Sequence, residues 1–141
     1  MKRILYSLLK TKLKLKKIIV LAPHPDDGEF ACGGTLSKFS EQGSEIWYVA
    51  FSPCIKSLPK GFAKDTLYKE LQNASSHLGI KKENIITYDF PVREFPKYRQ
   101  EILEKLIVLK KEIQPDLVLL PSSSDIHQDH HQIYIEGLRA F

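Results

Sequence analysis

The sequence contains little cysteine and no long apolar segment. Its two cysteines, Cys32 and Cys54, are too few for a disulfide framework and match no paired zinc-ribbon spacing. A reducing compartment is the default for such a chain, so we expect a cytoplasmic protein. No run reaches the roughly 18 apolar residues of a membrane-spanning helix. No small-residue cleavage site follows the basic N-terminus, so we do not expect a secretory signal either.

Acidic residues are absent from the first 17 positions, which carry seven lysines and arginines. The chain from Ile18 onward holds 14 basic and 17 acidic residues, so the net charge of +4 comes from the N-terminus. We expect residues 1–16 to form a basic amphipathic extension that is solvated or packed on a partner, with peripheral contact to an anionic membrane as the alternative. Because no basic stripe follows, the pI of about 9.0 does not indicate nucleic-acid binding.

The length of 141 residues suits a single domain, which we place at residues 17–141. Short apolar runs alternate with helical patterns from Lys17 onward, which predicts an α/β, Rossmann-like, three-layer fold with a parallel sheet of about four strands. The predicted strands are residues 18–22, 45–51, 84–88 and 116–120. The predicted helices are 33–42, 64–78, 98–113 and a segment from about 130 to the end. Four parallel strands leave an edge uncovered, so we expect that a C-terminal part is missing.

Polar residues are concentrated after the first predicted strand, in the sequence HPDDGEFACGGT. In doubly wound sheets, ligands bind at the carboxyl ends of the strands where the strand order reverses. Adjacent buried carboxylates need a cation or hydrogen bonds to compensate their charge. If His24 and Asp27 face a divalent metal, Asp26 faces another direction and is free to handle a proton. The glycine pair 33–34 would let the backbone approach the site at a helix N-terminus.

Two other interpretations of this loop exist. Pro and Asp are common turn residues, so the loop could be a solvated Asx turn. A dinucleotide-binding loop is disfavoured, because no Gly-x-Gly-x-x-Gly follows the strand directly.

The segment after the fourth predicted strand holds three histidines and two aspartates within residues 125–131. This density exceeds what a turn requires, although an exposed helix start capped by Asp129 is the alternative. A catalytic zinc site usually has three protein ligands and an open position. His24, Asp27 and one histidine of this second loop would complete such a site.

Both segments together resemble a known family. The chain carries AxHPDDxxxxxGGT at residues 22–35 and HxDH at residues 127–130, in strand contexts that match. It is thereby similar to the PIG-L, or LmbE-like, family of metal-dependent N-acetylglucosaminyl deacetylases. The resemblance implies that His24, Asp27 and His130 bind Zn²⁺, although Fe²⁺ also accepts two histidines and one carboxylate.

The resemblance also implies catalytic roles. Asp26 would be the general base that takes a proton from a metal-activated water. His127 would stabilise the oxyanion or protonate the leaving amine, with Asp129 holding its ring in place. The expected activity is hydrolysis of the N-acetyl group of an N-acetylglucosamine-type glycoconjugate, giving acetate and a free amino sugar. The sequence departs from the family at Gly28, where many members have Glu directly after the paired aspartates.

Further candidates and rival functions stay open. Arg93 and Arg99 could contact sugar hydroxyls or a phosphate of the substrate, and a surface ion pair is the alternative for each. One rival function is a non-catalytic sugar- or metal-binding module. A Rossmann-type nucleotide-binding module is another. The acetylated substrate and the oligomeric state do not follow from the sequence.

Overall fold

The computed structural model describes residues 15–141, so most of the predicted basic extension, residues 1–14, lies outside the described residues. Four parallel strands form one sheet in the order β3-β2-β1-β4. Their bounds are β1 (Lys17–Ala22), β2 (Glu45–Ala50), β3 (Ile85–Thr87) and β4 (Leu117–Leu119). The predicted α/β fold with a four-stranded parallel sheet is confirmed.

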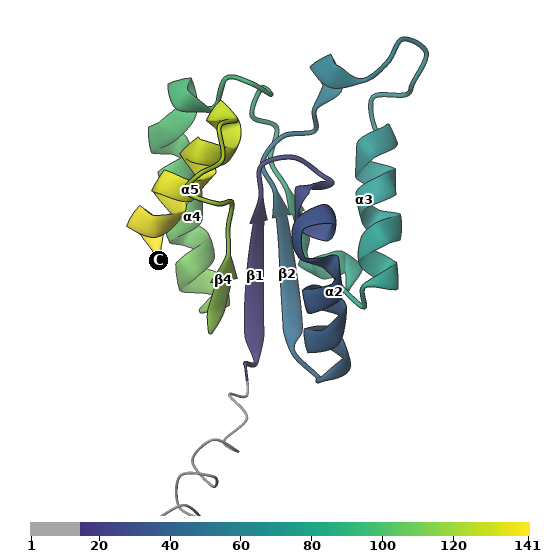
Figure 1. Cartoon of the computed structure of the whole chain (residues 1–141), viewed down its shortest axis with the longest axis vertical. Coiled ribbons are helices and arrows are strands. Elements are labelled where there is room, and N and C mark those ends of the chain that lie inside the picture. Colours follow the sequence, from purple (N-terminus) through teal and green to yellow (C-terminus); the bar gives the residue numbers. More distant parts are fainter. Residues whose placement is uncertain (1–14) are drawn as a thin grey trace, which may run out of the picture.

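Helices cover both faces of the sheet, which gives three layers (Figure 1). The two on one face are α2 (Asp27–Glu41) and α3 (Thr66–His77), and the two on the other are α4 (Arg99–Ile113) and α5 (Gln128–Ala140). Three short 3₁₀ helices lie in the connections: η1 (Ile55–Ser57), η2 (Lys82–Asn84) and η3 (Phe95–Tyr98). No helix among the described residues is long and apolar enough to cross a bilayer.

The alternating side chains of β1 divide the core into two parts. Ile18 and Val20 pack toward α2 and α3, whereas Ile19 and Leu21 pack toward α4 and α5. All four are at most 3% exposed, because a central parallel strand is covered on both faces. Full burial of each such side chain stabilises the fold by about 1.5–3 kcal/mol. This buried strand holds the loop that follows it in a fixed position.

The predicted strands and helices are found close to their expected bounds, with two informative differences at helix starts. Helix α2 begins at Asp27, six residues before the predicted start, and is kinked at Cys32, which has non-helical φ and ψ of −144° and 20°. The predicted start at Gly33 therefore marks only the part after the kink. Helix α5 begins at Gln128, and its N-cap is His127 and not Asp129.

The strand order reverses at β1. Strand β2 follows on one side of β1, and β4, the last strand in the sequence, pairs on the other side. The loops after β1 and β4 therefore leave the same end of the sheet next to each other. Figure 1 shows both loops at the upper end, where the strand arrows point. This is the position at which open α/β sheets bind their ligands.

Candidate active site

Three side-chain atoms from the two loops form an almost equilateral triangle. Nδ1 of His24 lies 3.3 Å from Oδ2 of Asp27, and Nε2 of His130 lies 3.3 Å from the same oxygen. The two ring nitrogens are 3.2 Å apart. Ligand atoms about 2.0–2.1 Å from a tetrahedral zinc ion are separated by about 3.3–3.4 Å. The donor set and its spacing thus fit three positions of a tetrahedral ion and leave the fourth position open.

Two further carboxylates orient the histidine rings toward this triangle. Nδ1 of His130 lies 2.7 Å from Oδ2 of Asp125, and Nε2 of His24 lies 3.1 Å from Oδ2 of Asp129. A carboxylate only accepts hydrogen bonds, so each of these nitrogens carries the proton. The lone pair of the other nitrogen of each ring then points into the triangle. Such a convergence of lone pairs is repulsive without a cation or an added proton, which is the arrangement expected of metal-ligating histidines.

His127 lies beside the two other histidines. One nitrogen from each of His24, His127 and His130 falls within 4.8 Å of the others, so the three rings could also hold a metal ion. The spacing of this group is looser than that of the triangle with Asp27. Moreover, Nδ1 of His127 accepts a hydrogen bond from the backbone N–H of Asp129 at 3.2 Å. The donor set of His24, Asp27 and His130 therefore fits an ion better, and His127 has a free Nε2 beside it.

The carboxylate of Asp129 does not hold the ring of His127, contrary to expectation. It is fully buried and accepts hydrogen bonds from Nε2 of His24 and from the backbone N–H groups of Arg93, at 2.6 Å, and Phe95, at 3.2 Å. Burial alone raises the pKa of Asp129, but these three hydrogen bonds lower it below its ordinary range. Asp129 thus links the loop after β3 to the histidine that follows β1.

The same contacts control the protonation of His24. Burial lowers the pKa of His24, but its hydrogen bonds to Asp129 and Asp27 outweigh burial and raise the pKa to about 9. A proton and a cation would therefore compete for this ring, as expected of a metal ligand. The pKa of His127 is lowered by burial and by the neighbouring charges of His24 and His130. His127 is therefore neutral at pH 7.

Asp26 has a different environment from its neighbour Asp27. It is the exposed N-cap residue of α2, and its side chain makes no hydrogen bond with another described residue. Asp26 lines a cleft of about 290 Å³ together with His24, His127 and Arg93. The sequence prediction that Asp27 joins the histidines while Asp26 faces elsewhere agrees with this geometry.

A buried tyrosine holds the loop after β1 in place. The hydroxyl of Tyr48 on β2 donates to the carbonyl oxygen of Pro25 at 2.8 Å and accepts from the backbone N–H of Gly28 at 2.9 Å. A Cβ atom on Gly28 would lie 2.7 Å from the Tyr48 ring. The departure from the family at Gly28 is therefore explained, because the tyrosine fills the space of a side chain there.

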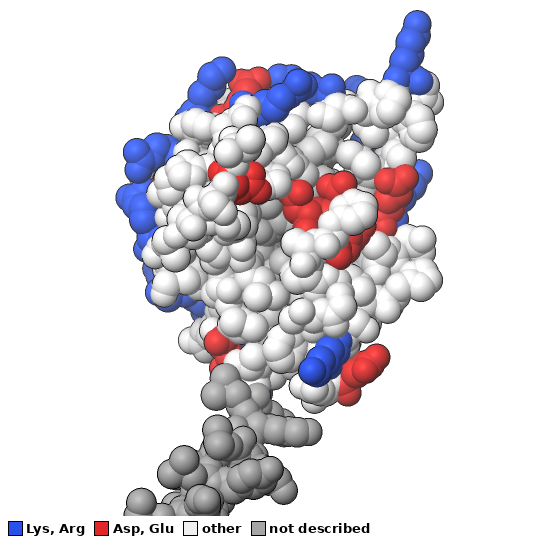
Figure 2. All heavy atoms as spheres, in the orientation of Figure 1, with Lys and Arg blue, Asp and Glu red and all other residues white. Residues whose placement is uncertain are grey.

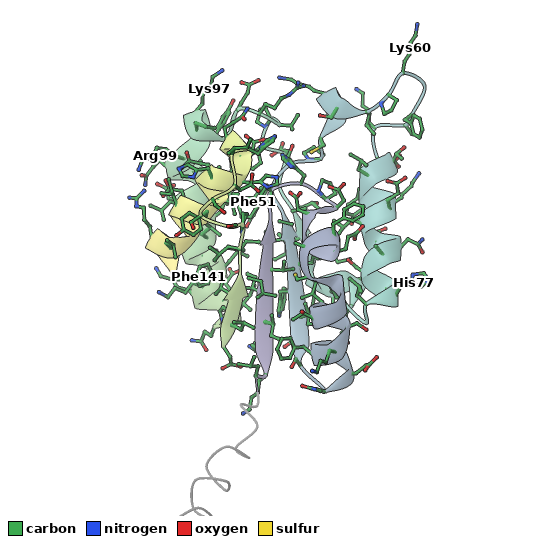
Figure 3. All side chains as sticks on the ribbon, in the orientation of Figure 1. Phe51, Lys60, His77, Lys97, Arg99 and Phe141 are labelled. Atoms are coloured by element: carbon green, nitrogen blue, oxygen red, sulfur yellow. The ribbon has the colours of Figure 1, made fainter. Side chains whose placement is uncertain are left out.

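The two candidate arginines have different positions. Arg93 lines the cleft and has a left-handed backbone with φ of 70°, which directs its N–H to Asp129. Arg99 lies on the outer side of α4 and α5 (Figure 3), where its Nε is 3.3 Å from Oε1 of the buried Glu136. Arg99 does not line the cleft of His24, Asp26 and His127. The structure thus shows the ion pair that was the alternative for Arg99, and a contact of Arg99 with substrate stays a prediction.

The glycine pair of the first motif also lies away from the centre. Gly33 and Gly34 follow the kink in α2, and a Cβ on Gly33 would meet only Leu78. The backbone at the site is instead that of Asp26 and Asp27, because α2 starts there. Acidic side chains thus surround the N-terminus of α2, which disfavours a phosphate and hence nucleotide binding. Figure 2 shows acidic atoms gathered in the upper middle of the visible face, with lysines and arginines mainly at its edges.

Sequence reasoning gave no role to Asp125 and Tyr48, although both support the centre. Asp125 precedes His130 by five residues, a spacing that no helix or strand period indicates. Tyr48 is one of several apolar residues in a strand, and its hydroxyl contacts appear only when β2 is paired with β1. Cys32 is a packed thiol whose Sγ donates to the carbonyl oxygen of Gly28, and burial raises its pKa.

Comparison with known proteins places this geometry in context. The chain is 28% identical over 135 residues to the diacetylchitobiose deacetylase of Thermococcus kodakarensis, covering 89% of this chain and 49% of that protein. It is 28% identical over 127 residues to a Bacillus anthracis protein described as a probable N-acetyl-α-D-glucosaminyl L-malate deacetylase, covering 82% and 54%. The chain thus spans about half the length of the curated relatives it matches.

A solved structure gives the same relationship. The N,N′-diacetylchitobiose deacetylase of Pyrococcus horikoshii, determined with an inhibitor, superposes with a TM-score of 0.77 at 26% identity, covering 99% of this chain and 56% of that one. The family model for GlcNAc-PI de-N-acetylase, PIG-L, matches residues 19–141. Two histidines and an aspartate thus lie around one point, at the place where the strand order of the sheet reverses. The chain belongs to the PIG-L family.

Proposed function

We propose that the protein is a metal-dependent hydrolase that removes the acetyl group from an N-acetylglucosamine unit of a glycoconjugate. The triangle formed by His24 Nδ1, Asp27 Oδ2 and His130 Nε2 carries this proposal, and membership of a family that contains N-acetyl sugar deacetylases supports it. These three residues would hold the ion. We assign it as zinc, although iron(II) accepts the same donors. When bound, the ion lowers the pKa of a water molecule and polarises the acetamide carbonyl.

The protein's own side chains would supply the proton transfers. Asp26, exposed at the rim of the cleft and free of contacts with other described residues, would accept a proton from the attacking water. The oxygen of this water would form a bond to the acetamide carbonyl carbon, the C–N bond would then break, and the proton taken up by Asp26 would pass to the departing nitrogen. The products are acetate and a free amine.

His127 would act on the developing negative charge. Its Nδ1 accepts from the Asp129 amide, so the proton of the neutral ring lies on Nε2. His127 lines the cleft that Asp26 and His24 also line, so this N–H would be available there. Such a donor stabilises an oxyanion without having to reorient during the reaction. Asp129 would serve as a positioning residue for His24.

Arg93 would contact the substrate at the rim of the cleft. Its side chain is exposed and makes no hydrogen bond or ion pair with another described residue. An arginine in this position can donate several hydrogen bonds to sugar hydroxyls or to an anionic group. Replacement of Arg93 by alanine should raise KM. Replacement of Arg99, which pairs with Glu136 on the outer surface, should leave KM unchanged.

The test is acetate release from N-acetylglucosamine and N,N′-diacetylchitobiose by the chain loaded with Zn²⁺ or, without oxygen, with Fe²⁺. Asp26→Asn should retain the ion and lose activity by about 10²–10⁴-fold, since it removes a general base. Glu101→Gln, an exposed carboxylate on α4, is the matched control and should retain full activity. A chain that binds the ion and releases acetate from neither sugar would contradict hydrolysis and favour a non-catalytic binding module.

A further inference from the structure

The loop that joins β2 to α3 combines exposed apolar side chains with lysines. Residues 55–64 have the sequence IKSLPKGFAK, which contains three lysines and no acidic residue. Every residue of this 55–64 loop except Leu58 is exposed. The exposed fractions of Ile55 and Phe62 are 44% and 57%, although apolar side chains are hydrated at a cost in free energy. The loop thus presents three positive charges and two largely uncovered apolar groups on one short segment.

A turn fixes the tip of the 55–64 loop. The backbone N–H of Phe62 donates to the carbonyl oxygen of Pro59 at 3.3 Å, and Gly61 between them has a φ of 99°. A turn with a positive φ at its third residue favours glycine, which adopts this conformation without strain. Lys60 and Phe62 are the neighbours of this glycine, so the turn presents a cation and an aromatic ring together. Figure 3 shows Lys60 at the end of the loop, pointing away from the rest of the molecule.

The acidic residues nearest to the loop do not neutralise its charge. Glu94 pairs with Lys56 at 2.7 Å but is shared with Lys97, at 3.0 Å. Asp65, the first acidic residue after the loop, pairs with Lys69 at 2.8 Å. The other two lysines of the loop form no ion pair with a described residue. Figure 2 shows lysine and arginine atoms along the upper border of the molecule and on the loop that extends from it.

The 55–64 loop borders the candidate active site. Ser57 within the loop and Leu67 after it line the cleft of about 290 Å³ that His24 and Asp26 also line. Figure 1 shows the loop extending beyond the upper end of the sheet, where the loops after β1 and β4 also lie. A surface that binds this loop would therefore lie at the same end of the molecule as the cleft.

We propose that the 55–64 loop is a docking site for the surface of an anionic lipid bilayer. Its three lysines would lie against the negatively charged head groups, and Ile55 and Phe62 would insert at the boundary between head groups and acyl chains. An aliphatic side chain such as Ile55 has no counterpart on a phosphate backbone, whereas a bilayer offers negative charge and hydrocarbon at one surface. This docking needs neither a bound ion nor hydrolysis, so it is independent of the proposed function.

The first experiment measures insertion of the loop directly in the full chain. Phe62→Trp places an indole at the tip, and Leu138→Trp, at a 60% exposed position on α5, is the matched control. Vesicles of phosphatidylserine and phosphatidylcholine should shift the tryptophan emission of Phe62→Trp to shorter wavelength, and brominated acyl chains should quench it. Phosphatidylcholine alone should have neither effect. The emission of Leu138→Trp should not change, and Trp47 contributes the same background to both variants.

The second experiment measures the contribution of single side chains by vesicle sedimentation. Lys60→Gln should raise the Kd for the phosphatidylserine vesicles by about fivefold, the effect of one lysine near an anionic surface. Phe62→Ala should raise it by about tenfold, because an aromatic ring would no longer leave water. Lys82→Gln, the same change of charge in η2 at the opposite end of the sheet, and Leu138→Ala are the controls and should bind like the wild type.

Three results would overturn the docking site. One is an emission of Phe62→Trp that anionic vesicles do not change. Another is vesicle binding by the full chain that neither Lys60→Gln nor Phe62→Ala weakens, since residues 1–16 would then account for it. The third is an equal loss in Lys60→Gln and Lys82→Gln, which would show attraction by net charge alone. None of these measurements uses acetate release, so failure of the proposed function would leave them unchanged.

Discussion

The cation triangle and the cavity of about 300 Å³ that Pro25, Tyr68 and Asp89 line are built differently. At the triangle, Asp125 and Asp129 hold the outer nitrogens of the His130 and His24 rings and so fix the direction of both rings. In the cavity, Asp89 has no partner among the described residues, and Tyr68 is partly exposed. The side chains around the triangle are thus fixed by several contacts, whereas Asp89 and Tyr68 keep groups that can still form hydrogen bonds or contacts.

The largest effect is expected when a proposed ligand of the metal ion is removed. His130→Ala leaves two of the three proposed ligands. Loss of a residue that only orients a ligand lowers metal affinity by up to about 100-fold, so we expect the affinity for Zn²⁺ to fall by more than this in His130→Ala. Elemental analysis after dialysis should find no ion. An ion retained at full occupancy would show that His130 is not a ligand, and His131→Ala, on an exposed neighbour, is the control.

A supporting carboxylate should have a smaller effect on the same measurement. Asp125→Ala removes the acceptor that holds Nδ1 of His130 and should lower Zn²⁺ affinity by about 10–100-fold. Competition with a chromogenic chelator gives the affinity. Ser123→Ala, an exposed position in the same loop, should not change it. An unchanged affinity in Asp125→Ala would mean that the ring of His130 is oriented by other contacts.

Tyr48 should affect the whole loop after β1, because its hydroxyl holds the carbonyl of Pro25. Tyr48→Phe leaves this buried carbonyl and the N–H of Gly28 without their partner, which should lower the free energy of unfolding by about 1–3 kcal/mol. Urea unfolding measures the loss, and Tyr134→Phe is the control. A wild-type unfolding curve for Tyr48→Phe would contradict the role of this hydroxyl.

The smallest effect is expected at the opposite end of the sheet. Asp116 accepts hydrogen bonds from the backbone N–H groups of Lys17, at 2.9 Å, and Lys16, at 2.7 Å, which lower its pKa from the ordinary value of 3.8. A lowered folded-state pKa adds stability above the ordinary value, and this stability is lost as the pH falls through the folded-state pKa. The difference in Tm between wild type and Asp116→Asn should therefore shrink below about pH 4. A constant difference from pH 6 to pH 3 would exclude this linkage, and neither metal nor sugar binding should change.

Sequence reasoning found the elements because each leaves a local pattern, and the same patterns brought His24, Asp27 and one histidine of the second loop together. The choice of His130 among these histidines came from the resemblance to the PIG-L family. Apolar runs such as residues 18–22 mark buried strands, and two motifs at strand ends mark a shared edge. Contacts between distant segments leave no such pattern. The ion pair of Arg99 with Glu136 could not be read from the sequence, because Glu136 lies in the last helix. The carboxylate of Asp129 was assigned to its near neighbour His127, whereas it reaches His24, 105 residues away.

The Gly28–Tyr48 contact limits how the chain can vary. With 2.7 Å between a Cβ at position 28 and the tyrosine ring, no larger residue fits unless the aromatic side chain on β2 becomes smaller. The two positions therefore have to change together, as a pair. Gly28→Glu should therefore be tolerated only together with a smaller residue at position 48. In such a double variant the side chain at position 28 would fill the space that the Tyr48 ring now occupies below the loop.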